Sequence, residues 1–182
     1  MTGDLQLTRY MTPVSSSPYT VLQARLQAWL VNLLSVVVEA YELGAVIGKG
    51  ARIVVGDDEL TPDVIYVPNS ARKSVKPDAI YGPPALVVDV LHSEMGEDAR
   101  ATLRRRYAAA RVLEYWQIEA DRGRGFCYQA DANWNYDLIP PDKGGLHYSA
   151  AIVQLAFPVE WFRKQPGLLT LMEWWGLVEA AK

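Results

Sequence analysis

The run ALVVDVLH, at residues 85–92, constrains the fold more than any other part of the chain. Its residues are apolar at nearly every position instead of alternating with polar ones. Side chains alternate along a strand, so Asp89 shares one face with Val87 and Leu91 while its neighbouring valines lie on the other. A strand that is apolar on both faces must be covered on both sides, which is typical of a central strand. We therefore predict an α/β protein built around this strand.

The remaining patterns predict one α/β domain over residues 1–182, with a mixed central sheet flanked by helices, an N-terminal arm at 1–17 and a helical tail at 158–182. Apolar spacing predicts a long helix that begins at a Ser17 cap and Pro18 and stops at Gly44, and a second helix that turns its arginines outward. The predicted helices are at residues 18–43 and 94–111, with one or two short helices divided at 166–167. The predicted strands are at 45–48, 51–55, 63–67, 85–92, 113–121, 126–131 and 133–140, with one or two more in 144–157.

Composition excludes several classes of protein. Half of the residues are hydrophobic and 21% are charged, which argues against disorder. A single cysteine excludes an internal disulfide, and the first residues lack a secretion signal, so we expect a cytoplasmic protein. Asn32 and Ser35 interrupt the apolar stretch of the first helix, so we expect a buried helix and no membrane partner. A net charge of -3 argues against coating nucleic acid, so any such role must be local.

Asp89 poses a problem, because an ionised carboxylate is rarely buried unless it is paired or binds a metal. Asp63 begins the strand at 63–67, so it would lie near Asp89 if the two strands are neighbours. Two close carboxylates repel each other unless a divalent cation lies between them, and hard oxygen ligands suit Mg²⁺ or Mn²⁺. The alternatives are that Asp63 is only a turn residue and that Asp89 pairs with an arginine.

The ordered set TPDVIYV, PPALVVDVLHSE, an arginine-rich helix ending in Tyr107, and LEYWQIEAD resembles the Uma-two family of putative endonucleases. This family belongs to the PD-(D/E)xK restriction-endonuclease-like superfamily. The resemblance runs from about Ser15 to Phe162 and implies a restriction-endonuclease-like fold. It matches Asp63 to the aspartate of the family's Pro-Asp pair and Asp89 to its glutamate.

The chain departs from the family pattern where a lysine is expected. Leu91 stands at the lysine position of the superfamily strand, and Leu103 stands at the alternative position on the following helix. Arg100 and Arg104 flank Leu103 and are the arginines expected near a phosphate, although such a run is also typical of a solvated helix face. Asp78 is interpreted as a turn residue.

These observations predict a magnesium- or manganese-dependent enzyme that cleaves DNA, with an incomplete active-site motif. Asp63 and Asp89 would hold the metal, and Arg104 or Arg100 would lie near the phosphate. The alternative is a degenerate, non-catalytic member that acts as an oligomerising or nucleic-acid-binding module, which the missing lysine favours. A homodimer is also expected, since closed two-fold pairs are the commonest assemblies.

Overall fold

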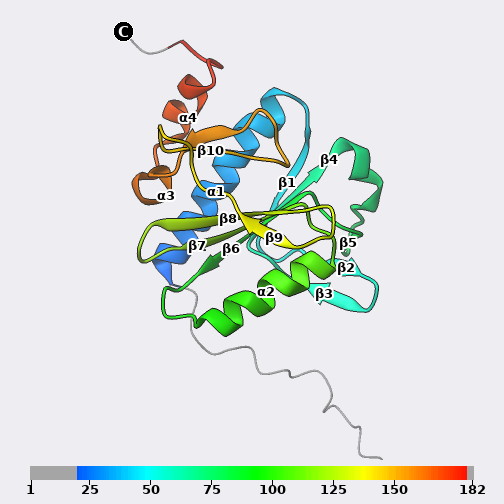
Figure 1. The fold of residues 1–182 in the computed structure, drawn as a ribbon. Helices are drawn as coiled ribbons and strands as arrows, with labels where there is room; N and C mark the ends of the chain where they lie inside the picture. Colours follow the sequence, from blue (N-terminus) through cyan, green and yellow to red (C-terminus); the bar gives the residue numbers. More distant parts are fainter. Residues whose placement is uncertain (1–19, 180–182) are drawn as a thin grey trace, which may run out of the picture.

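A computed structural model of the chain describes residues 20–179 and contains a six-stranded sheet with helices on both faces (Figure 1). The helices are α1 (Val21–Ala40), the 3₁₀-helix η1 (Asn69–Ser74), α2 (Glu97–Ala109), α3 (Trp161–Lys164) and α4 (Leu168–Trp174). The strands are β1 (Gly44–Gly48), β2 (Ile53–Val55), β3 (Asp58–Leu60), β4 (Val64–Pro68), β5 (Ile80–Tyr81), β6 (Leu86–Leu91), β7 (Glu114–Glu119), β8 (Arg124–Ala130), β9 (Tyr136–Leu138), β10 (Leu146–Tyr148) and β11 (Ala156–Pro158). The large sheet has the order β1-β4-β6-β7-β8-β9.

The prediction of a central apolar strand is confirmed by β6. This strand pairs antiparallel with β4 and parallel with β7, so the sheet is mixed as expected. All six residues of β6 are buried, because both of its faces are covered. The predicted meander of β7, β8 and β9 is also present.

Two hydrophobic cores lie on opposite faces of the sheet. One core packs α1 against residues such as Val88 and Trp116, and the C-terminal helices extend it. The other core packs α2 and the three-stranded sheet β3-β2-β5 against Val87 and Tyr115. Since alternate residues of a strand point to opposite faces, Asp89 lies on the same face as Val87, beneath α2.

The first helix differs from its prediction at both ends. It begins at Val21, because the Thr20 side chain accepts a hydrogen bond from the Gln23 N–H and Gln23 Oε1 accepts one from the Thr20 N–H. The predicted Ser17 cap lies outside the described residues. By length and composition alone α1 could cross a membrane, but seven of its residues, Leu26 and Leu30 among them, are buried in the core.

The acidic segment at 56–59 turns at Gly56 and Asp57, and Asp58 and Glu59 then belong to β3, which pairs with β2 in the small separate sheet. One other prediction about local structure was wrong. The arginines of α2 do not all face outward, because Arg100 is 6% exposed. Its position on the helix places it over the end of β7, where the buried carboxylate of Glu119 requires a cation.

Glu114 attaches the C-terminal part of the chain to the sheet. Its carboxylate is 2% exposed and accepts hydrogen bonds on both oxygens. Oε1 accepts from Trp116 Nε1 at 2.6 Å and contacts His147 Nε2 at 3.1 Å, while Oε2 accepts from the Ser149 hydroxyl at 2.6 Å and the Ala151 N–H at 2.8 Å. The β10–β11 hairpin and the loop after β10 are therefore held through one buried charge.

Candidate active site

Two aspartates meet where β4 and β6 pair. Val64 pairs with Val88, so Asp63, one residue before β4, lies next to Asp89 at the end of this ladder. The Asp63 carboxylate reaches β6 itself, since its Oδ2 accepts a hydrogen bond from the Val90 N–H at 2.7 Å. The structure thus brings together the two acids that the sequence singled out.

Asp89 is a buried carboxyl group held by two tyrosines. It is 7% exposed, and its oxygens accept hydrogen bonds from the hydroxyls of Tyr107 at 3.2 Å and Tyr115 at 2.8 Å. Burial raises the pKa of Asp89 to about 7; the hydrogen bond from Tyr115 opposes this rise, and the charge of Asp63 adds to it. The group therefore changes charge close to neutral pH.

Asp63 forms an ion pair with Lys49, a residue that nothing in the sequence had singled out. Lys49 Nζ lies 2.9 Å from Asp63 Oδ1, and the lysine side chain is about half exposed. Lys49 follows β1 in the tight turn to β2, where Gly50 has a φ of +103°, a conformation that favours glycine. The only sequence signal for this cation is its place between two glycines in GKG.

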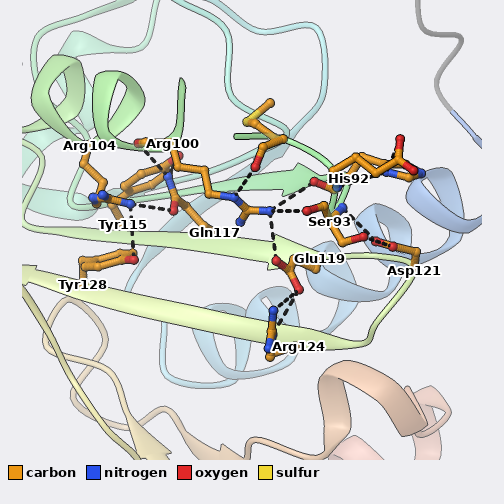
Figure 2. Close-up of polar contacts among 12 residues, drawn as sticks. His92, Ser93, Arg100, Arg104, Tyr115, Gln117, Glu119, Asp121, Arg124 and Tyr128 are labelled. Atoms are coloured by element: carbon orange, nitrogen blue, oxygen red, sulfur yellow. Dashed lines mark hydrogen bonds and ion pairs between the residues drawn. The ribbon is translucent and has the colours of Figure 1, made fainter. Parts of the chain in front are cut away.

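A chain of hydrogen bonds extends from Asp89 through Tyr115 and Gln117 to Arg104, and Figure 2 shows its part from Tyr115 to Arg104. Gln117 pairs with Asp89 in the β6–β7 register, and its Nε2 donates to the Tyr115 hydroxyl at 3.1 Å. Its Oε1 accepts from Arg104 Nη1 at 3.2 Å, and the same nitrogen donates to the Tyr128 hydroxyl at 3.4 Å. Of the two predicted arginines, Arg104 is thus linked to the acid pair through two side chains.

Arg100 lies in a separate ion pair. Its Nη2 is 2.9 Å from Glu119 Oε1 and donates to the His92 carbonyl at 3.1 Å, and its Nε donates to the Met95 carbonyl at 2.9 Å. These contacts place its guanidinium at the C-terminal end of β7. Its predicted role near a phosphate stays a prediction.

The side chains of His92 and Asp78 make no hydrogen bond to the acid pair, within the part of the chain that the structure describes. His92 is exposed, and its Nδ1 is 4.0 Å from Glu94. Asp78 accepts a hydrogen bond from the Tyr81 hydroxyl at 2.5 Å in an exposed loop, in agreement with a turn residue.

The acid pair offers only two carboxylates to a metal ion. Within residues 20–179 no group of three or more histidine, cysteine, aspartate or glutamate side chains is placed to hold a metal ion. Mg²⁺ commonly binds one or two carboxylates and completes its coordination with waters and substrate phosphates, so two aspartates suffice. Lys49 and the two tyrosines are the groups with which a metal would share these oxygens.

Comparison with known proteins gives a family and a fold. The family model Uma2, described as "Putative restriction endonuclease", matches residues 12–163. A solved structure of "a putative nuclease belonging to DUF820" from Anabaena variabilis superposes with a TM-score of 0.64 and 13% identity, over 80% of this chain and 82% of that one. No protein with a curated description matches the chain.

Proposed function

The chain belongs to the Uma2 family of restriction-endonuclease-like proteins, and from this premise we propose that it is a metal-dependent endonuclease that cleaves DNA. The observation that supports the proposal most strongly is the convergence of Asp63 and Asp89 at one end of the β4–β6 ladder. Lys49, which is paired with Asp63, would supply the cation that this chain lacks at Leu91, the position of the lysine in the superfamily strand. Acids and a cation at one place are what phosphodiester cleavage requires.

Each residue has a distinct part in this proposal. Asp63 and Asp89 would hold Mg²⁺ or Mn²⁺, which when bound would activate a water and neutralise phosphate charge. Tyr107 and Tyr115 orient the Asp89 carboxylate, because both donate hydrogen bonds to it. Lys49 would stabilise negative charge on the phosphate beside Asp63.

Two arginines would assist at a greater distance. Arg104 would contact the phosphate backbone from α2, since its guanidinium is linked through Gln117 to the acid pair. Arg100, held by Glu119, would contribute positive charge from the end of β7.

A second candidate is a non-catalytic module that binds nucleic acid or assembles with itself. The hydrogen bonds of the acids favour it, because Lys49 satisfies Asp63 and two tyrosine hydroxyls satisfy Asp89 without a metal. A homodimer and a cytoplasmic location stay predictions under both candidates.

Incubation with supercoiled plasmid tests the proposal. In Mg²⁺ or Mn²⁺ we expect nicked and linear products, and we expect Asp63→Ala to slow their formation by at least about a hundredfold, because one of two metal ligands is lost. Agarose gels over a time course measure both rates.

The matched control is Asp137→Ala, which removes an exposed carboxylate from β9 and should cleave as the wild type does. Lys49→Gln should keep metal binding and cleave more slowly, by roughly tenfold or more, since it removes one charge near the phosphate. A wild-type protein that leaves the plasmid intact in every divalent metal would refute the enzyme and favour the non-catalytic module.

A further inference from the structure

A cavity lies between the start of α2 and the faces of β7 and β8 that α2 covers, and one of its lining residues, Gln117, is the strand partner of Asp89. Its volume is about 170 Å³. It is lined by six polar or charged residues and one aromatic residue: Glu97, Arg100, Gln117, Glu119, Arg124, Tyr128 and Phe126. Gln117 lines the cavity and also donates to the Tyr115 hydroxyl, which in turn donates to Asp89, so two side chains connect this cavity to the candidate active site.

The cavity contains a buried donor that lacks an acceptor. Arg100 is 6% exposed, and its Nη1 makes no hydrogen bond to the described part of the chain. No other buried side-chain nitrogen or oxygen within residues 20–179 is in this state. Its remaining nitrogens bind Glu119 and the backbone carbonyls of Met95, His92 and Ser93 (Figure 2). Because an unsatisfied buried donor is costly, an acceptor bound in the cavity that Arg100 lines would be favoured.

Charge at the inner wall also favours an anion. Arg100 and Arg124 share the single carboxylate of Glu119, with contacts of 2.9 Å to each, which leaves one excess positive charge. Glu97 is paired with Arg104, so its charge does not oppose an incoming anion.

A further donor faces the same space. The Tyr128 hydroxyl accepts a hydrogen bond from Arg104, so its own hydrogen stays available to an acceptor. A guanidinium nitrogen and a hydroxyl that converge beside excess positive charge suit an oxyanion with several acceptor oxygens.

We propose that this cavity binds a phosphate group. The identity of the ligand rests on the proposed function. The phosphate would belong to the same DNA strand as the phosphodiester at Asp63 and Asp89, and its binding would position that DNA strand. The connection through Gln117 and Tyr115 supports this arrangement, because Gln117 lines the cavity and pairs with Asp89 across the β6–β7 ladder, on the same face of the sheet. Inorganic phosphate has the same chemistry and is the second source that the test must separate.

The test follows the guanidinium NMR signals of Arg100 in the full chain, in EDTA, during titration with sodium phosphate and separately with a short DNA duplex. We expect saturable shifts with both ligands and none with sodium chloride of equal ionic strength. Arg124→Gln should weaken binding about tenfold, because it removes the excess charge. Arg105→Gln is the matched control, since Arg105 is an exposed arginine on α2 that should leave binding unchanged.

Each other outcome overturns part of the proposal. Arg100 signals that respond to no ligand would mean that the cavity holds water only. A response to inorganic phosphate without one to the duplex would overturn the assignment to a nucleic-acid strand. The titration is repeated with Asp89→Asn. If the Arg100 signals of this variant still shift with phosphate, and the wild type does not cleave plasmid, the proposed endonuclease is refuted but the phosphate site is not.

Discussion

Replacing Asp89 with asparagine is expected to stabilise the metal-free protein at pH 8.5. Burial raises the pKa of Asp89 to about 7, well above the value near 3.9 of an unfolded aspartate. The folded state therefore holds this proton more tightly, so the stability present below about pH 4 is lost as the pH rises to about 7 and stays lost above it. Asparagine is uncharged at every pH and has nearly the same shape.

The size of this effect follows from the shift in pKa. Three pKa units correspond to about 4 kcal/mol at most, so we expect Asp89→Asn to gain about 2–4 kcal/mol over the wild type at pH 8.5. At pH 5 the two proteins should differ less, because most wild-type molecules then carry a protonated Asp89. Urea unfolding in EDTA at both pH values measures the difference. Asp137→Asn is the control for an exposed carboxylate, and an Asp89→Asn variant that is less stable than the wild type at pH 8.5 would contradict the prediction.

Replacing Glu114 with alanine is expected to cause the largest loss of stability of any single change considered. The substitution leaves four donors, from Trp116, His147, Ser149 and Ala151, without their shared acceptor in a buried place. Removing one member of such a network costs about 3–5 kcal/mol, which for a chain of this size lowers Tm by roughly 10 °C. Thermal and urea unfolding followed by circular dichroism measure the loss.

Two variants make the Glu114 result specific. Glu114→Gln keeps the shape of the side chain but places an amide among donors, so its loss should be intermediate. Asp137→Ala removes an exposed acid and should change the free energy of unfolding by less than about 0.5 kcal/mol. Equal stability of Glu114→Ala and the wild type would show that the C-terminal hairpin does not depend on this carboxylate.

The central strand and the meeting of the two acids could be predicted from the sequence because both follow from local rules. The apolar run at 85–92 predicts a strand that is covered on both faces, and all six residues of β6 are buried in this way. Once the strand at 63–67 neighbours β6, the positions of Asp63 and Asp89 follow from pairing alone. The family resemblance pointed to the same pair.

Lys49 and Arg100 could not be placed in this way, because their positions depend on distant contacts. Lys49 reaches Asp63 from a turn whose direction is set by β1 and β2. Arg100 occupies a helix position that a surface pattern assigns to solvent, but Glu119 on β7 and the carbonyls before α2 draw it inward. In both cases a partner far along the chain decides where a charged side chain lies, and helical or strand spacing carries no information about that partner.

Calorimetric titration with Mn²⁺ at pH 8.5 tests the sharing of a cation by Asp63 and Asp89 most directly. We expect the wild type to bind one ion and both Asp63→Asn and Asp89→Asn to lose this binding. Because Asp89→Asn should be more stable than the wild type at this pH, its loss of binding could not be attributed to unfolding. Wild-type and Asp89→Asn isotherms that coincide would contradict a shared metal site and leave the acid pair with a purely structural role.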